Sequence, residues 1–242
     1  MEVSLEHEST LDFNFWPSFA DLMLALVLIL VLVLFLVVAI ISVGTINLSH
    51  VEKNQNDMIK KIASMYTSEA KELSTDLYGI SINRSGSYDI VIRNEPALQR
   101  ITFSDNILFQ PDDDQLNETG QRVLRVVGDS LKQQLSLIRE IQIQGHADTA
   151  KTVRFPSNVH LASSRAISVY TFLQHSIGID PAQHLMSANS FGEFKPIQRS
   201  EDDETYDWQK IESNNSSLEL KGKNRRIELL LFYRLKTNDQ RN

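Results

Sequence analysis

The stretch IQIQGHAD at residues 141–148 alternates isoleucine with glutamine and then ends in Gly-His-Ala-Asp. Alternation with a period of two is typical of a β-strand, and glycine marks where this strand ends. The stretch NVHLASSRA follows at residues 158–166 and begins a helix that Gly178 is expected to stop. The sequence therefore predicts a strand, a polar loop and a helix in succession.

Three polar side chains of this unit form a candidate binding site. A strand end followed by a helix start brings the carboxylate of Asp148 near the guanidinium of Arg165, with Asn158 at the expected N-cap. The trio suits a zwitterionic ligand, because the carboxylate can bind an ammonium while the guanidinium and the free N–H groups of the helix start bind a carboxylate. Asp–Arg pairs are more often structural, so the residues alone leave both interpretations open.

The neighbouring segments extend this unit to an α+β domain. We expect a short strand pair over residues 80–94, a helix over residues 121–135 and a closing strand over residues 224–235. The polar segment Gln198–Lys223, which contains the acidic run Glu201–Glu204, is expected to be an exposed loop. A partner-binding or cation-binding loop is the alternative.

The N-terminal part of the chain predicts a membrane anchor. About twenty consecutive apolar residues, within an expected transmembrane helix at residues 15–43, would span roughly 30 Å, the hydrocarbon thickness of a bilayer. Residues 1–14 carry four carboxylates and lack the Lys or Arg that a signal peptide needs, so we expect a retained single-pass anchor. All 24 Lys and Arg residues lie at or after Lys53, which by itself favours an N-terminus outside the membrane.

Residues 44–79 are expected to form a linker helix. Apolar residues recur there at helical spacing and predict one apolar stripe from about Val51 onward. This stripe either packs on its own domain or pairs with a second copy of the chain as a dimerisation helix. Its members are Met58, Ile62, Met65, Leu73 and Leu77.

Asp21 is the one ionisable residue between Phe15 and Ile40. Pro17 suits the first turn of a helix, so a helix that starts there carries Asp21 about one turn inside, where a carboxylate must pair or take up a proton. The alternative is a hydrated carboxylate that marks the helix end. The surrounding residues favour a functional role for Asp21.

The composition excludes several kinds of site. The 242 residues carry a formal charge of −7 and contain no cysteine, which excludes disulfides and thiolate metal sites. His146 and Asp148 have no third ligand or nucleophile nearby, so we predict neither a metal site nor an enzyme. Neither a cofactor nor a nucleic-acid partner is expected.

The domain motifs occur in the order GHAD, NVHLASSRA, NSFGEFKPI and NRRIE. This order resembles the peptidoglycan-binding domain shared by OmpA-like proteins and flagellar motor B subunits, whose pattern is GHTD, LS-x-x-RA, G-x-G-x-x-x-P and NRRVE. The resemblance covers residues 101–235 and implies an OmpA-like α/β-sandwich with a mixed sheet, periplasmic, over residues 80–238. It also implies that Asp148 and Arg165, supported by Asn158, bind the diaminopimelate of the peptidoglycan peptide stem.

Other positions of the same motifs are assigned supporting roles by this resemblance. His146 belongs to the GHAD motif, and Arg225 and Arg226 match the closing NRR, where at least one arginine has a structural or rim role. The departures from the family pattern are Ala147 for Thr, Ala162 for Ser, and a segment KTVRFP that lengthens the spacing between the aspartate and the arginine. These departures affect ligand choice and affinity, while the Asp–Arg pair is retained.

The segment WPSFADLMLALVLILVLVLFLV, which begins at Trp16, resembles the ion-carrying helix of motor B subunits. The resemblance implies that Asp21 carries the transported ion, H⁺ or Na⁺, beside MotA-like A subunits, with small neighbours at Ala20 and Ala25 for close helix contact. It further implies a dimer in the bacterial inner membrane. The N-terminus would be cytoplasmic and the domain periplasmic, opposite to the charge bias.

Two features direct this resemblance to one class of motor. The tail is acidic where flagellar B subunits have a basic tail, and about sixty residues separate the membrane from the first domain motif. The chain therefore looks like the B subunit of Zorya-type anti-phage systems (ZorB), which works with a ZorA-like A subunit in defence. A flagellar-type stator B subunit and a passive envelope tether are the alternatives, and a TolR/ExbD-like transducer normally lacks the wall-binding domain.

Overall fold

The computed structural model describes residues 15–65, 70–82, 88–200, 202–203 and 205–234. The chain divides into two compact units, the first ending at Ile46 and the second beginning at Asn47. The expected acidic tail and the Ser-Gly-Ser of the predicted strand pair lie outside the described residues. The elements in chain order are α1 (Trp16–Met65), β1 (Lys71–Ser74), β2 (Leu77–Ile80), β3 (Ile90–Glu95), β4 (Leu98–Ser104), α2 (Asp105–Leu108), α3 (Glu118–Lys132), a 3₁₀ turn η1 (Leu135–Leu137), β5 (Ile138–His146), α4 (Asn158–Thr171), a π-helical turn η2 (Phe172–Ile177), β6 (Leu185–Gly192), α5 (Trp208–Ser213), α6 (Leu218–Asn224) and β7 (Arg226–Tyr233).

The first unit contains the apolar part of α1. The stretch Trp16–Ser42 is 27 residues long and, by length and composition, can cross a bilayer. Its large apolar side chains are exposed within the part of the chain that the structure describes. The helix begins at Trp16 with Pro17 in its first turn, where a missing N–H costs no helical hydrogen bond. The predicted N-terminal apolar helix is confirmed.

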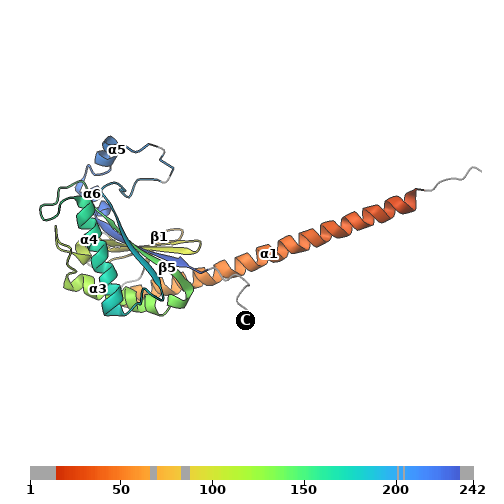
Figure 1. Cartoon of the computed structure of the whole chain (residues 1–242), viewed down its shortest axis with the longest axis horizontal. Coiled ribbons are helices and arrows are strands. Elements are labelled where there is room, and N and C mark those ends of the chain that lie inside the picture. Colours follow the sequence, from red (N-terminus) through yellow and green to blue (C-terminus); the bar gives the residue numbers. More distant parts are fainter. Residues whose placement is uncertain (1–14, 66–69, 83–87, 201, 204, 235–242) are drawn as a thin grey trace, which may run out of the picture. The chain divides into compact units, whose positions relative to one another are not determined.

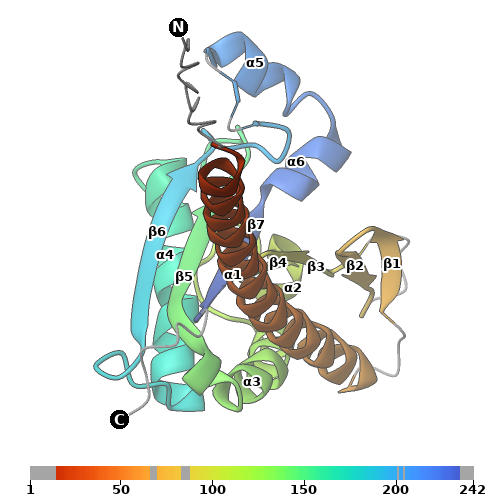
Figure 2. The same cartoon turned by 90° about the vertical axis from the view of Figure 1, so that its right-hand side faces the viewer.

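The second unit contains, within the described residues, one seven-stranded mixed sheet. Its strand order is β1-β2-β3-β4-β7-β5-β6, which Figure 2 shows from β6 across to β1. β5 and β6 run parallel, and all other neighbouring pairs of the sheet are antiparallel. The last strand, β7, is inserted between β4 and β5, and its consecutive apolar residues are buried. The predicted α+β domain with a mixed sheet is confirmed.

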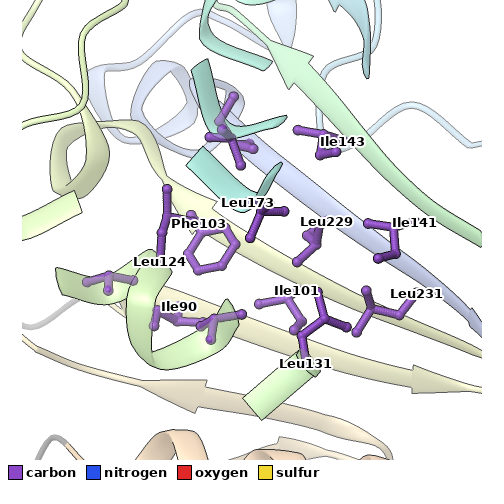
Figure 3. Close-up of a cluster of buried hydrophobic side chains, with 14 of the residues drawn as sticks. Ile90, Ile101, Phe103, Leu124, Leu131, Ile141, Ile143, Leu173, Leu229 and Leu231 are labelled. Carbon is purple, nitrogen blue, oxygen red and sulfur yellow. The ribbon is translucent and has the colours of Figure 1, made fainter. Parts of the chain in front are cut away.

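The core lies where helices α3 and α4 cover the sheet (Figure 1). α3 presents a side chain to this core every three or four residues, the spacing of one helical face. Figure 3 shows these side chains meeting the inward residues of β3, β4, β5 and β7. The labelled core residues are Ile90, Ile101, Phe103, Leu124, Leu131, Ile141, Ile143, Leu173, Leu229 and Leu231.

The predicted linker helix is shorter than expected. α1 ends at Met65, and Leu73 and Leu77 lie in the strands β1 and β2. Asp76 adopts a positive φ of 60° between these strands and makes the tight turn that pairs them. The periodic spacing of apolar residues in the sequence thus continues past the end of α1 into the hairpin of β1 and β2, so the spacing alone did not mark where the helix ends.

The apolar stripe of α1 packs on its own domain. Met58 and Ile62 are fully buried in the same core as the sheet residues. Buried amides fix this contact: Gln55 Nε2 donates to the carbonyl oxygens of Glu95 and Leu98 at 3.1 Å each. Of the two interpretations of the stripe, the structure therefore favours packing within the chain over pairing between chains.

The polar segment before β7 is more ordered than the predicted loop. It contains α5 and α6, whose N-caps Asp207 and Ser217 each accept a hydrogen bond from a backbone N–H three residues on. Asn224 ties the segment to the domain, because its Oδ1 accepts from the backbone N–H of Ile197 at 2.9 Å. Short polar helices with little apolar periodicity cannot be distinguished from loops by sequence pattern, which explains why a loop was expected here.

Candidate functional site

Three charged residues of the candidate site lie at one end of the sheet. Asp105 directly follows β4, Arg225 directly precedes β7, and Asp148 follows β5 by two residues. Because β7 lies between β4 and β5, with Arg226 paired to His146, the three residues meet at the same end. The backbone N–H of Asp105 donates to the carbonyl oxygen of Arg225 at 3.1 Å, which fixes two of them together.

Asp148 is held in place from several directions. Its Oδ1 accepts a hydrogen bond from the backbone N–H of Ala150 at 2.9 Å, and its Oδ2 forms an ion pair with Nη1 of Arg225. Its backbone carbonyl accepts from Nδ2 of Asn158 at 3.0 Å. The N-cap of α4 is Ser157, one residue before the expected Asn158. Asn158 therefore supports the loop that carries Asp148 instead of capping the helix.

A glycine brings the arginine of α4 close to the strand end. A Cβ atom built on Gly145 would lie 2.0 Å from the carbonyl oxygen of Ala162, far inside van der Waals contact. Only glycine permits α4 to pass so near β5. Arg165 follows Ala162 by about one helical turn and thereby reaches the end of the sheet.

Arg165 is enclosed by the site that it helps to build. Its Nη1 lies 2.9 Å from Oδ1 of Asp105, its Nε donates to the carbonyl oxygen of Asp113 at 2.8 Å, and its Nη2 donates to that of Gln110 at 3.3 Å. The guanidinium lies 5.1 Å from the ring centre of Phe109. Its side chain is only 3% exposed. Burial lowers its pKa, and the carboxylate of Asp105 opposes that shift.

The structure adds Asp105 to the predicted site. This buried carboxylate contacts Arg165 and also lies 4.0 Å from Nε of Arg225, which in turn pairs with Asp148. Arg165, Asp105, Arg225 and Asp148 thus alternate in sign and form what we call the charge chain. Burial raises the pKa of Asp105, while the two guanidinium groups lower it. A lone aspartate after a strand gives no local signal, so sequence inspection missed it.

The extra residues of the KTVRFP segment fold onto the loop before α3. Asp112, at a positive φ of 55°, accepts from the hydroxyl of Thr152 and from the next two backbone N–H groups. Arg154 pairs with Asp113 at 3.1 Å. The hydrogen bond from Thr152 is the main reason that the pKa of Asp112 is below its usual value. The extra residues therefore hold in place the loop before α3, whose carbonyl groups accept hydrogen bonds from Arg165.

The remaining predicted residues, His146 and Arg226, lie in a separate buried cluster. Nε of Arg226 pairs with Oε1 of Glu228 at 2.6 Å, and its other nitrogens donate to two backbone carbonyl groups. His146 stacks on Phe191 and faces the same glutamate at 3.8 Å. Among the described residues, no group of three or more His, Asp or Glu is arranged to hold a metal ion. Neither His146 nor Arg226 belongs to the charge chain.

The buried His146 predicts an acid-sensitive domain. Burial, with the nearby charge of Arg226, lowers its pKa from 6.5 to about 3, so the unfolded chain binds a proton that the folded domain does not. The contribution of His146 to the free energy of unfolding is therefore retained above pH 6.5 and is lost as the pH falls below that value, by about 2 kcal/mol at pH 5. Urea denaturation of the wild type and of His146→Phe at pH 7 and pH 5 checks this. The other titratable groups are the same in both proteins, so the difference between their losses of stability reports His146. An equal loss in both proteins would contradict the assignment.

The sequence of the domain is similar to that of known protein families. Residues 108–207 match the model of the OmpA family. The chain is 28% identical over 142 residues to Motility protein B of Bacillus subtilis (strain 168), an alignment that covers 55% of this chain and 45% of that protein. The chain thus spans less than half the length of this relative. Both likenesses are to non-enzymatic families, as the sequence predicts.

Solved structures share the fold. The periplasmic domain of Helicobacter pylori MotB matches with a TM-score of 0.52 at 22% identity, covering 68% of this chain and 90% of that one. A putative MotB-like protein from Desulfovibrio vulgaris matches with a TM-score of 0.53 at 20% identity, covering 75% and 96%. At these identities the likeness extends to the fold and no further.

Proposed function

We propose that this MotB-like chain, with its OmpA-family domain, is the B subunit of an ion-driven motor in the bacterial inner membrane. A 27-residue stretch that can cross a bilayer precedes a domain with the fold of a periplasmic MotB domain, which supports a single-pass topology. The N-terminus would be cytoplasmic, because a domain that binds the cell wall must lie outside the membrane. The MotB likeness implies MotA-like A subunits as partners.

The domain is proposed to anchor the motor to peptidoglycan. Asp148 and Arg165, with Asn158 in support, would bind the diaminopimelate of the peptide stem, which carries both an ammonium and a carboxylate. The observation that carries this proposal is the charge chain at one end of the sheet, where two carboxylates and two guanidinium groups alternate. Its members Asp148 and Arg165 lie within the residues that match the OmpA family. Such a neutral set of paired charges can receive a zwitterion without gaining net charge.

Sedimentation with purified peptidoglycan sacculi tests the anchor. Asp148→Ala and Arg165→Ala should each lower the affinity for sacculi roughly tenfold or more, because a hydrogen bond to a charged group contributes about 1.5–3 kcal/mol. The fraction of protein in the pellet measures this loss. Circular dichroism of each variant checks that the domain is folded.

Arg139→Ala is the matched control for this experiment. Arg139 lies at the opposite end of β5, is 63% exposed and reaches its nearest carboxylate only at 4.0 Å. Its removal should leave the pelleted fraction unchanged. Undiminished pelleting of both Asp148→Ala and Arg165→Ala would refute the proposed site.

The membrane part is proposed to carry the ion. Asp21 is the one carboxylate of the stretch Trp16–Ser42 and lies five residues, roughly 7.5 Å, into α1. Beside A subunits it would cycle between protonated and ionised states and move H⁺, with Na⁺ as the alternative ion. The motor would contain two copies of the chain, and since the stripe of α1 is buried in its own domain, that pairing would use other surfaces.

The biological role is proposed to be anti-phage defence of the Zorya type. The acidic residues of the tail and the length of chain between the span and the first domain motif support this assignment over a flagellar stator. A passive tether would need the wall-binding domain and would not need Asp21. Phage plating and swimming motility, measured for Asp21→Asn, separate these roles.

A further inference from the structure

The two arginines of the charge chain differ in what they can offer a ligand. Arg165 uses all three of its nitrogens within the domain, its guanidinium lies over the ring of Phe109, and its side chain is 3% exposed. It could present two parallel N–H groups to an incoming carboxylate only by giving up contacts that are themselves buried. Such contacts are costly to break, because the groups left behind would be unpaired.

Arg225 has the opposite character. Its side chain is 41% exposed, and within the part of the chain that the structure describes its Nη2 contacts no carboxylate or carbonyl group. Its Nη1 pairs with Oδ2 of Asp148, and its Nε lies 4.0 Å from Asp105. One edge of its guanidinium therefore faces solvent while the other is held by two carboxylates.

Arg225 also blocks the carboxylate of Asp148, which the ammonium group of a ligand would bind. The side chain of Asp148 is only 4% exposed, its Oδ1 is taken by the N–H of Ala150, and its Oδ2 is taken by Arg225. An ammonium can reach Asp148 only if the guanidinium moves aside. Asp105 lies beside Nε of Arg225, so a guanidinium that leaves Asp148 still has a counter-ion at its base.

We propose that Arg225 is the specificity-determining residue of the site: in the free domain it occupies the ammonium position on Asp148, and in the complex it binds the ligand's carboxylate. The inference rests on the proposed peptidoglycan binding and adds Arg225 to Asp148 and Arg165 as the exposed partner of the ligand's carboxylate, while Arg165 also positions Arg225 through Asp105. The ligand's ammonium replaces the guanidinium on Asp148, and its carboxylate replaces Asp148 on the guanidinium. Each charge exchanges one partner for another, so only a zwitterionic end group satisfies both.

The test measures selectivity with the full-length chain in detergent. Isothermal titration compares the tripeptide L-Ala-γ-D-Glu-meso-diaminopimelate with the same peptide amidated at the ε-carboxyl group. The wild type should prefer the free acid by about tenfold or more, and Arg225→Gln should bring this preference within about twofold. Arg225→Gln should also bind the amide as well as the wild type or better, because Asp148 is then open. A variant whose domain is merely damaged would bind both peptides more weakly.

Two further variants complete the experiment. Arg139→Gln, an equal loss of charge at an exposed site, should keep the wild-type preference. Arg225→Lys keeps the charge without the two-pronged donor and should retain an intermediate preference, which also guards against a folding defect of the glutamine variant.

The outcomes separate the inference from the proposed function. If the wild type binds the free acid and Arg225→Gln keeps its full preference, Arg225 is not a partner of the carboxylate, while peptidoglycan binding stands. If Arg225→Gln loses both peptides equally, Arg225→Lys decides, and a full wild-type preference in that variant likewise overturns the inference. If wild type and control bind neither peptide nor sacculi, the proposed function is wrong and the inference fails with it. Loss of preference in Arg225→Gln alone supports both.

Discussion

Asp21→Asn should abolish ion conduction by the complex of this chain with its A subunits. Asparagine has nearly the shape of aspartate and cannot take up and release a proton, and the stretch Trp16–Ser42 offers no other ionisable side chain. Proton uptake by proteoliposomes that contain the complex, followed with a pH-sensitive dye, should fall to the level of empty liposomes. The same variant should lose phage protection in cells, with swimming motility as the second readout.

The loss would not come from poor insertion. A carboxylate costs about 2.5–3.5 kcal/mol at the centre of a membrane helix and less toward the ends, so its replacement by an uncharged amide should make insertion easier. Western blotting of the membrane fraction checks the amount inserted. Glu52→Gln is the matched control, because Glu52 is an exposed carboxylate on α1 outside the stretch that can cross the membrane.

The outcome also decides between classes of function. Wild-type conduction or phage protection by Asp21→Asn, at wild-type amounts in the membrane, would leave a passive tether as the better account of the chain. Loss of motility in place of phage protection would identify a flagellar-type stator. Loss of both conduction and protection supports the Zorya-type motor.

Local patterns in the sequence predicted much of the domain. The alternation at residues 141–144 gave β5, and the regular apolar spacing within residues 121–135 gave α3. Glycine in the GHAD motif predicted a strand end, and the structure adds its second role, the close passage of α4. These features lie within a few residues of one another, where periodicity and turn chemistry act directly.

The interactions that build the charge chain could not be predicted in the same way. Asp105 and Arg165 are sixty residues apart, and their contact depends on β7 being inserted between β4 and β5. Sheet order is a tertiary property that alternation within single strands does not encode. For the same reason the sequence paired Arg165 with Asp148, its nearest candidate in the chain, whereas the structure pairs Asp148 with Arg225.

Asp105→Ala should destabilise the domain by about 3–5 kcal/mol, because it leaves the guanidinium of Arg165 buried without a counter-ion. The side chains of Asp105 and Arg165 are 10% and 3% exposed, so water cannot replace the lost carboxylate. Urea denaturation of a fragment that begins at Asn47, followed by circular dichroism, measures the change in the free energy of unfolding. Glu140→Ala is the control, since its ion pair with the exposed Arg139 spans 4.0 Å and contributes about 1 kcal/mol or less.

A double-mutant cycle isolates the contact between the two residues. Arg165→Ala alone should also destabilise the domain, because it strands the buried carboxylate of Asp105 and two carbonyl groups. The double variant should lose at least about 1 kcal/mol less than the sum of the single losses, since neither charge is then left alone. Additive losses would mean that the 2.9 Å contact does not couple the two side chains. A coupled pair would instead show that the carboxylate of Asp105 holds the guanidinium of Arg165 inside the domain.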